Sequence, residues 1–413
     1  MWQKPWGYKE GFVISGGLFL VGTLWQIVRG KCTLGWLAYP VNLYAGVLYI
    51  VLLIGCYVGL RNRSYAVRWM SSYPAAVASM VSVVGLTVVM GLIRQSTVHV
   101  PLIGIERWLG FSQMLSACSF LLLFFWFVTV LGLVIVRRIY SFAWRDIPFL
   151  FNHLGLFLAL VGAVLGSADM QRLEMTTYSG KAEWRALNRQ KEWIELPLAI
   201  ELHEFIIDEY PPKLVLVDNR TGEVLPTEKP ENLLIEEQVR QGQLMDWQID
   251  IIQCLPMSAS VATADTLRFV DFYSRGATLA LYLKATYIPT GKQREGWVSC
   301  GSFLFPYKAL QLDSLVSLIM PEREPKRFAS EITVYTQSGK EVKATVEVNQ
   351  PLEIDGWKIY QLSYDKSEGK WSDTSVFELV RDPWLPVVYI GIWMLIGGAI
   401  CLFIMPHRKK EKV

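Results

Sequence analysis

The sequence predicts a bundle of six membrane-spanning α-helices and a large all-β domain that lies outside the membrane. Of its 413 residues, 52% are hydrophobic and only 19% are charged, whereas soluble proteins carry about 25% charged residues. Six long stretches contain no charged residue at all. Between the fifth and sixth stretches, residues 169–385 change to short β-rich runs and hold 24 Lys and Arg against 33 Asp and Glu. This composition excludes an ordinary soluble enzyme.

The six apolar stretches have the length of membrane spans. Each runs for 18 to 21 residues, enough for an α-helix to cross a hydrocarbon core of about 30 Å. The first stretch is long for a signal peptide, lacks a small-x-small cleavage site and leads directly to the next span. The predicted spans are 11–28, 43–60, 74–92, 116–136, 148–166 and 385–405.

The basic residues that flank the spans predict the orientation of the chain. Twelve Lys and Arg fall on one side of the spans and four on the other, and short cytoplasmic loops are the ones enriched in Lys and Arg. We therefore expect a multi-pass protein of the cell inner membrane with both termini in the cytoplasm. The predicted division is a five-span bundle at 1–168, an extracytoplasmic β-rich domain at 169–384, and a closing helix with a basic cytoplasmic tail at 385–413.

The outer segment has the pattern of an all-β sandwich or distorted barrel. Runs rich in β-branched and aromatic residues, several with alternating polarity, are separated by turn signals such as Thr290-Gly291-Lys292. Its acidic balance gives no clustered positive face, which argues against nucleic acid as a partner. The expected strands are 193–207, 213–217, 247–252, 277–288, 297–305, 331–336, 342–348, 357–364 and 374–380.

The six cysteines show no C-x-x-C pair and no metal-ligand spacing. A thiol oxidoreductase mechanism therefore has no support in the sequence. Cys254 and Cys300 both fall in the outer domain, where they either form a disulfide or serve as small apolar core residues.

The four histidines are weighed one by one as candidates for chemistry. His407 lies in the basic tail and His203 alternates with apolar neighbours on an expected strand, so we expect both at the surface. His99 lies in the outer loop between the third and fourth spans, which makes it a secondary candidate. His153 is the main candidate because it lies inside the fifth span, where a polar side chain marks a functional site by default.

Helical spacing predicts the direction in which His153 points. Gly155, Ala159, Gly162 and Gly166 form a stripe of small residues suited to close helix packing. At about 100° per residue, His153 projects almost opposite this stripe, so it faces another helix, a cofactor or a partner subunit. The imidazole is suited either to a hydrogen bond with a neighbouring helix or to ligation of a haem iron. Stable six-coordinate haem needs two axial ligands, and no second histidine lies in a span.

Six short motifs follow one another between about residues 145 and 405. They are Asn152-His153-Leu154-Gly155-Leu156, Gly166-Ser167-Ala168-Asp169, Leu196-Pro197-Leu198-Ala199-Ile200-Glu201-Leu202, Val348-Asn349-Gln350-Pro351, Gly356-Trp357-Lys358-Ile359-Tyr360-Gln361 and Asp382-Pro383-Trp384. This ordered set, with its succession of span, outer β domain and closing span, resembles the ResB-like family of System II cytochrome c biogenesis proteins.

The resemblance implies a membrane subunit that carries haem outward together with a CcsA/ResC-type partner. The haem is then delivered to apocytochrome c, where two thioethers form at a C-x-x-C-H motif. His153 matches the family's intramembrane histidine, a contributor to an inner haem site, and His99 is the second candidate. Five spans precede the outer domain where the family usually has three, and the partner is not fused to this chain. We therefore expect haem shared with a partner subunit, and a chain that acts in a cytochrome c haem lyase complex and does not catalyse the reaction alone.

The alternative from another class is a membrane chaperone or insertase with an extracytoplasmic β domain and no haem role. Such a protein is expected to line a polar groove within the membrane, and the predicted spans hold no Arg or Lys for one. A self-sufficient b-type electron carrier is disfavoured because it needs two ligands per haem. Hydrolase and ATPase functions lack their H-E-x-x-H, triad or Gly-rich loop motifs.

Overall fold

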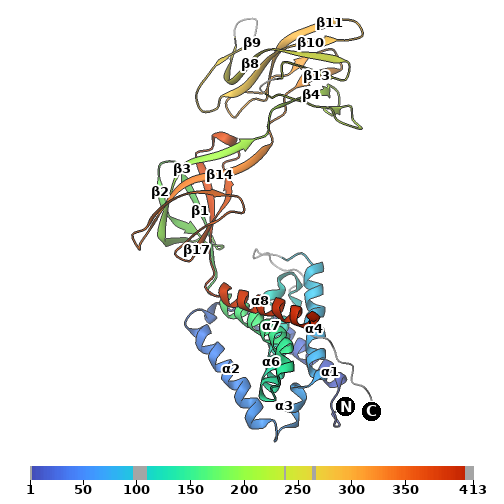
Figure 1. Cartoon of the computed structure of the whole chain (residues 1–413), viewed down its shortest axis with the longest axis vertical. Coiled ribbons are helices and arrows are strands. Elements are labelled where there is room, and N and C mark those ends of the chain that lie inside the picture. The colour runs from blue at the N-terminus through green and yellow to red at the C-terminus, as the bar shows by residue number, and fades with distance from the viewer. Residues whose placement is uncertain (1, 96–108, 237–238, 263–266, 405–413) are drawn as a thin grey trace. The chain divides into compact units, whose positions relative to one another are not determined.

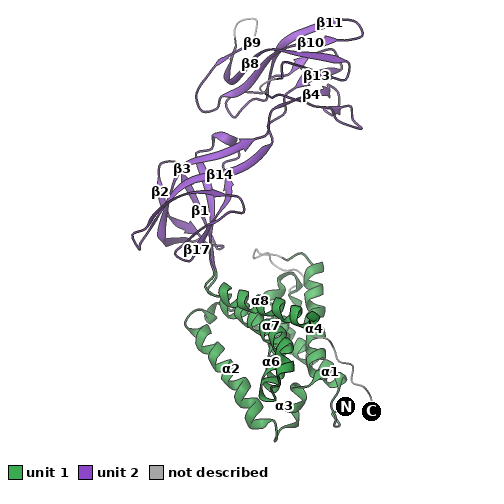
Figure 2. Cartoon of the chain, in the orientation of Figure 1, with its two compact units in different colours: residues 1–170, 382–413 green, residues 171–381 purple. Residues whose placement is uncertain are grey.

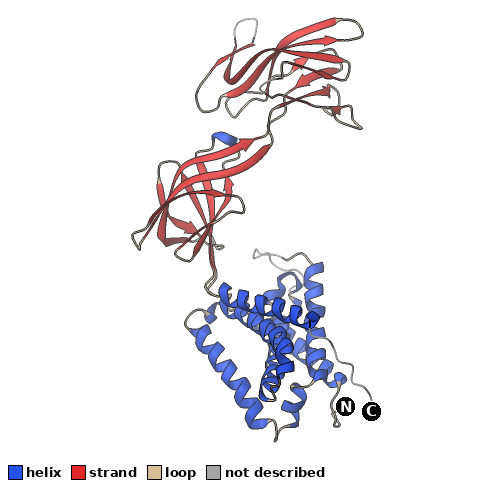
Figure 3. Ribbon diagram, in the orientation of Figure 1, coloured by secondary structure: helices blue, strands red, loops and turns tan. Residues whose placement is uncertain are grey.

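The computed structural model describes residues 2–95, 109–236, 239–262 and 267–404 (Figure 1). The chain divides into two compact units, which we call the helical unit (residues 1–170 and 382–413) and the β unit (residues 171–381) (Figure 2). Figure 3 shows long helices in the first unit and strands in the second. The predicted combination of apolar helices and a large β-rich domain is confirmed.

The helical unit contains six helices that are long and apolar enough to cross a membrane. Each overlaps one of the six predicted spans, with ends that differ by at most four residues, so the molecule fits a multi-pass membrane protein. The elements are α1 (Tyr8–Arg29), η1 (Gly35–Leu37), α2 (Val41–Leu60), α3 (Tyr65–Met70), α4 (Tyr73–Leu92), η2 (Phe111–Ser116), α6 (Cys118–Tyr140), η3 (Trp144–Asp146), α7 (Ile147–Gly166) and α8 (Leu385–Ile404).

Helix α6 lies at the centre of this unit and packs against α1, α2, α4 and α7. The closest pairing joins α7 to α8, which lie side by side in Figure 1. A Cβ added to Gly155 would lie 2.6 Å from the Gly391 carbonyl oxygen, and one added to Gly391 would lie 2.6 Å from that of Gly155. The small-residue stripe of α7 therefore packs against α8, as its spacing predicts.

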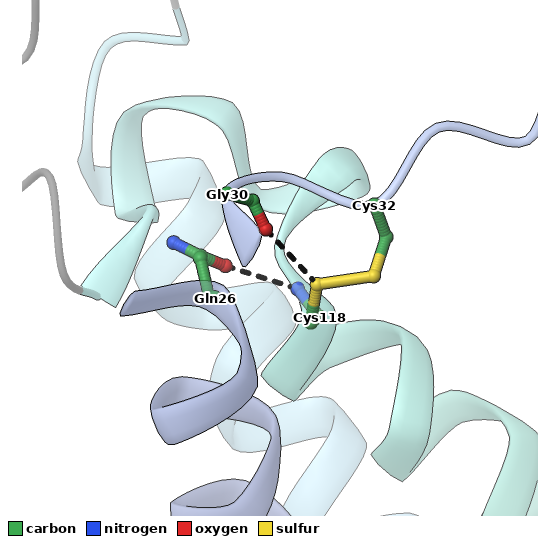
Figure 4. The surroundings of a disulfide bond; sticks show 4 residues. All are labelled: Gln26, Gly30, Cys32 and Cys118. Atoms are coloured by element: carbon green, nitrogen blue, oxygen red, sulfur yellow. Dashed lines mark hydrogen bonds between the residues drawn. A yellow bond between two sulfur atoms is a disulfide. The ribbon is translucent and has the colours of Figure 1, made fainter. Parts of the chain in front are cut away.

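A disulfide joins the loop after α1 to the first residue of α6 (Figure 4). Cys32 and Cys118 form it, and the backbone N–H of Cys118 donates to Oε1 of Gln26, 3.0 Å away. No spacing pattern in the sequence predicts this pair. The disulfide considered for Cys254 and Cys300 is absent, because both thiols are free and pack beside the core of the β unit.

A polar cluster closes the helical unit at the point where the chain leaves for the β unit. The carboxylate of Asp169 accepts hydrogen bonds from the Tyr39 N–H (2.7 Å), Asn42 Nδ2 (2.6 Å) and Trp384 Nε1 (2.8 Å). Asn42 is fully buried in the first turn of α2 and also donates to the Leu165 carbonyl. This cluster ties the start of α2 to the end of α7 and the start of α8.

The β unit contains eighteen strands among the described residues, connected by tight turns. They are β1 (Gln171–Tyr178), β2 (Ala182–Leu187), β3 (Trp193–Glu209), β4 (Lys213–Asp218), β5 (Val224–Leu225), β6 (Leu233–Leu234), β7 (Gln241–Leu244), β8 (Trp247–Ala262), β9 (Leu267–Asp271), β10 (Thr278–Tyr287), β11 (Lys292–Ser299), β12 (Leu310–Gln311), β13 (Val316–Ile319), β14 (Pro325–Thr336), β15 (Glu341–Glu347), β16 (Leu352–Ile354), β17 (Trp357–Tyr364) and β18 (Thr374–Arg381), with a short helix η4 (Gly369–Trp371).

Eight of these strands form one curled antiparallel sheet, in the order β15-β14-β3-β2-β1-β18-β17-β16. Every strand sends side chains into one core around Trp357 and Phe377, so the sheet wraps upon itself. Alternate residues of β1 and β18 face this core, for example Leu173 and Met175 paired with Leu379 and Phe377. This is the period-two burial expected of strands with one solvated face.

Two smaller sheets share a second core. One has the order β11-β10-β8-β7 with β9 beside β8, and the other has the order β12-β13-β4-β5 with β6 beside β4. Their inner faces meet around Leu281, Ile249 and Leu318. The strand predicted at 297–305 is displaced, because the strand runs from Lys292 to Ser299 and the chain then turns at Gly301, whose φ is 75°.

Candidate functional site

A cavity of about 570 Å³ lies between α4, α6 and α7, within the size range of small-molecule sites. It opens where α4 begins, α6 ends and α7 begins, the end that the charge pattern predicts to be cytoplasmic. Apolar side chains from the three helices make up most of its wall, and the polar side chains of His153, Arg137 and Arg138 also line it. The structure therefore places the main sequence candidate in a cavity and not against lipid alone.

Packing of α7 against α8 sets the direction of His153. The small residues of α7 occupy the α8 side, so His153 points toward α4 and α6. Its Nδ1 lies 2.9 Å from the Phe149 carbonyl oxygen one turn earlier. Because a carbonyl oxygen only accepts, Nδ1 carries the proton and Nε2 carries the lone pair. An imidazole held in this tautomer is ready to ligate a metal through Nε2.

The aromatic ring of Phe149 supports His153 from one side. The two rings stack with their centroids 3.7 Å apart and their planes 20° apart. On the same Phe149 ring, the Arg138 guanidinium lies 5.0 Å from the centroid. Arg138, Phe149 and His153 thus form one connected set on the wall of the cavity, and the set restricts the rotamers of the imidazole.

Two arginines place positive charge at the same cavity. Arg138 Nε forms an ion pair with Asp146 Oδ1 at 3.2 Å. Arg137 Nη1 donates to the Ser71 carbonyl at 2.9 Å, and among the described residues no carboxylate lies within ion-pair distance of it. The hydroxyl of Ser72 also lines the cavity without a hydrogen-bond partner in the described part of the chain. These groups suit the anionic or polar end of a ligand whose body is apolar.

The groups that line the cavity are chemically suited to an iron porphyrin. The apolar wall suits the porphyrin, Arg137 and Arg138 suit its carboxylates, and Nε2 of His153 suits the iron. In the described residues, no three His, Cys, Asp or Glu side chains are close enough together to hold a metal ion. Among the described residues, His153 is the one histidine that lines the cavity, and the cavity presents no cage for a bare metal.

Of the other histidines, the described residues include only His203, which is not part of this site. His203 lies on β3 of the β unit, where its Nε2 is 2.6 Å from the Thr333 hydroxyl. His99 and His407 lie outside the described residues. Arg137 and Arg138 were not recognised from sequence as site residues, although two consecutive arginines at the cytoplasmic end of a span, on the same predicted side as His153, were a usable signal.

These units fit the class of multi-pass membrane proteins, with a large β domain and a cavity among the helices. Comparison with known families gives a more particular result. The ResB-like family model matches residues 292–373, from β11 to the turn before β18, which confirms the resemblance over that part of the β unit. No curated protein matches the chain. The matched family is associated with cytochrome c biogenesis.

Proposed function

We propose that this chain is the ResB-type membrane subunit of a System II cytochrome c maturation complex. In this function it receives haem at the cavity between α4, α6 and α7 and passes it outward with a CcsA/ResC-type partner. Apocytochrome c in the outer compartment is the acceptor. The observation that carries the proposal is the 2.9 Å distance between His153 Nδ1 and the Phe149 carbonyl oxygen, which assigns the proton to Nδ1 and leaves Nε2 as a ligand in an apolar cavity with two arginines.

The chain's own residues each have a role in this proposal. His153 orients the haem and ligates its iron, and Phe149 fixes the plane of the imidazole. Arg137 binds a haem carboxylate at the mouth of the cavity. Arg138 is already paired with Asp146, so it contributes as part of a fixed positive wall. A partner subunit supplies the second axial ligand, because the described spans contain no histidine other than His153.

The disulfide supports the sidedness that the proposal needs. Disulfides persist in oxidising compartments outside the cytoplasm, and Cys32 and Cys118 both lie at the ends of α1 and α6 that the charge pattern predicts to be outside. The β unit follows α7 on this same predicted side. Two independent observations thus support an extracytoplasmic β unit.

The test is haem content in the complex of this chain with its CcsA/ResC-type partner. His153→Ala should insert and pair with the partner normally, because its substitution leaves the α7–α8 packing face unchanged. Haem measured by absorbance after purification should fall severalfold, and added imidazole should restore part of it by entering the vacated ligand position.

His203→Ala is the matched control, since it removes a histidine from the β unit that has its own hydrogen-bond partner. It should leave haem content unchanged. Full haem loading and normal cytochrome c maturation in His153→Ala would refute the ligand role. His99 would then be the next candidate.

Substitution of the arginines tests haem retention separately from axial ligation. Arg137→Gln should weaken haem retention, since a charge-assisted hydrogen bond is lost, while the spectrum of the haem that remains should keep its axial ligation unchanged. Arg63→Gln removes a charge from the same predicted side at a residue that does not line the cavity. Equal haem loss in both variants would show that overall charge, and not this site, is responsible.

A further inference from the structure

A groove of about 1260 Å³ opens in the β unit beside β11. One side of it is β11 and the other is the segment 308–314, which contains β12. In the described sheet, β11 is the terminal strand and its ladder partner is β10. Trp297 of β11 gives the groove an aromatic wall, packed 5.4 Å from Phe269 and 5.3 Å from Tyr282 between ring centroids.

Beyond Ser299, the outer edge of β11 has no ladder partner among the described residues, although β12 packs beside the strand near Gly296. Ser299 and Lys308 exchange two backbone hydrogen bonds of 2.9 Å, which begins an antiparallel pairing. If this pairing continued in register, Trp297 would pair with Leu310. The ladder partner of Leu310 is Leu318 of β13, and Trp297 has a ladder partner only in β10 among the described residues. No backbone hydrogen bond links 292–297 to 309–314 among the described residues.

Backbone groups therefore face the groove at alternate residues of β11. Outward-facing N–H and C=O groups recur every second residue in an antiparallel strand, so Gln293, Glu295 and Trp297 share the outward direction of Ser299. A strand edge of this kind is a template for an added strand. At Gly296 the side chain of Leu310 packs directly on β11, since a Cβ there would lie 2.8 Å from Leu310 Cδ1, so the strand edge before Gly296 is the part available for pairing.

Four cationic side chains line the groove: Arg268, Lys292, Arg294 and Lys308. In the part of the chain that the structure describes, none of them lies within ion-pair distance of a carboxylate. Arg294 Nε donates to the Leu312 carbonyl at 3.3 Å. The positive charge of the groove is thus not neutralised by neighbouring described side chains.

The two acidic residues of the groove have partners of their own. Glu295 lies 3.9 Å from Lys284 Nζ, and Asp313 accepts from the N–H groups of Leu315 and Val316 at 2.7 and 2.8 Å. The β unit as a whole is acidic, with 24 Lys and Arg against 31 Asp and Glu over residues 171–381. The groove is a positive site within a negative domain.

We propose that this groove binds an extended acidic segment of a partner protein, which adds a strand to the open edge of β11. The backbone of β11 supplies hydrogen bonds to the segment, and the groove cations bind its Asp or Glu side chains. A compact dicarboxylate would use the cations and leave the open strand edge unfilled, whereas an extended segment satisfies both. This interaction surface is separate from the cavity at His153 and does not depend on haem binding there.

The test is binding of a short fluorescent peptide, in which Glu alternates with Val, to the full chain in nanodiscs. Lys292→Gln with Lys308→Gln should weaken binding about tenfold, since two peripheral charge pairs are lost. Neither lysine side chain has a described ion pair, so folding should be unaffected. The same peptide N-methylated at alternate residues should bind at least tenfold more weakly, because it keeps its charge but cannot pair with the strand.

The matched control is Lys326→Gln with Lys343→Gln, which removes the same charge from exposed positions elsewhere in the β unit. It should leave the affinity unchanged. Equal weakening by the control pair, equal binding of the N-methylated peptide, or equal binding of a peptide with Lys in place of Glu would each overturn the proposal. Displacement of the peptide by equimolar succinate would assign the groove to a small anion instead. If the acidic peptide does not bind at all, the proposal is wrong, and the charges of β11 instead protect an edge strand against pairing with other chains.

Discussion

The indole Nε1–H of Trp384 donates to Oδ2 of Asp169 across 2.8 Å, although the two residues are 215 positions apart in the sequence. Asp169 follows α7 and Trp384 precedes α8, so the hydrogen bond joins the two points at which the chain crosses between the helical and β units. Gly166 makes room for the indole, since a Cβ there would lie 2.5 Å from Trp384 Cβ. Two short motifs that support the family resemblance therefore meet in one contact.

This contact predicts a specific loss of stability. Trp384→Phe keeps an aromatic ring beside Gly166 but removes the hydrogen bond to a carboxylate, so unfolding should become easier by about 1 kcal/mol. Thermal unfolding in detergent should show a decrease of roughly 2–4 °C in Tm. Trp393→Phe is the control on the same helix, because Trp393 is 69% exposed in the structure and has no described hydrogen bond. An equal decrease in both variants would contradict the role given to the contact.

The stability that the polar cluster around Asp169 provides depends on pH through the charge on the Asp169 carboxylate. Burial raises the pKa of Asp169, but the hydrogen bonds from Tyr39, Asn42 and Trp384 outweigh it and hold the pKa below its ordinary value of 3.8. A carboxyl group whose pKa is lower in the folded protein than in the unfolded chain stabilises the fold when pH is above the unfolded-state pKa. This stabilisation is lost as pH falls through the folded-state pKa. Wild type should therefore exceed Asp169→Asn in Tm at neutral pH, and the difference should vanish in acid below pH 3.8. A difference that is independent of pH would be evidence against an ionised Asp169.

The glycine contact between α7 and α8 gives a third prediction. Gly155→Ala places a methyl group 2.6 Å from the Gly391 carbonyl oxygen, so the helices must separate, at a cost of about 1–3 kcal/mol. Gly85→Ala is the same change in the middle of α4, where a Cβ would meet nothing within 4 Å. It should leave the Tm unchanged or raise it slightly, because Ala favours a helix over Gly by up to about 1 kcal/mol. A reversed order of the two Tm values would contradict the packing.

Alkylation of the purified protein should distinguish the cysteines. Four thiols should react under denaturing conditions before reduction, namely those of Cys56, Cys254, Cys300 and Cys401, and six after it. Cys32→Ser should release Cys118 as a fifth reactive thiol and lower stability by about 2–4 kcal/mol, since the bond closes a long loop. Six reactive thiols in the untreated protein would show that the bond is absent.

Reporter fusions check the orientation. A fusion after Asp169 should be active outside the cytoplasm and a fusion after Lys410 inside, as the distribution of twelve Lys and Arg against four predicts. The position of Cys32 and Cys118 supports the same result. Activity of either fusion on the opposite side would reverse the topology and remove the basis for an outer β unit.

The helices could be predicted from sequence because membrane spans are defined by length and lack of charge, both of which are local properties. The predicted span 74–92 and helix α4 (Tyr73–Leu92) differ by a single residue. Strands were predicted less evenly. The strand Trp357–Tyr364 was placed correctly, whereas β1 was missed because Glu174 and its polar neighbours hide the buried alternation of Leu173 and Met175.

Edge strands are the harder case, as β11 shows. Its first residues, Lys292 to Glu295, are all exposed, so they carry none of the apolar signal of a core strand. The predicted strand accordingly began at Trp297, where burial starts. Hydrophobic patterns therefore predict strands at the open edge of a sheet less well than core strands.

The candidate site was predictable only in part. The direction of His153 follows from helical spacing, but the cavity depends on how α4 packs beside α6 and α7, which no local pattern specifies. The disulfide has a similar origin. Cys32 and Cys118 each lie close to the predicted outer end of a span. This shared position indicates that the two can meet, whereas C-x-x-C spacing does not detect such a pair.

Under the proposed function, the oxidised pair of Cys32 and Cys118 also sets a condition on cytochrome c maturation. Thioether formation needs the two thiols of an apocytochrome in reduced form, so under the proposed function a reductant must operate in the compartment where Cys32 and Cys118 stay bonded. Thiol–disulfide exchange depends on the access of the attacking thiolate to sulfur, and Cys118 is only 2% exposed at the start of α6. Reduced and oxidised cysteine pairs can therefore coexist a short distance apart, kept distinct by steric shielding of one sulfur and not by separate redox environments.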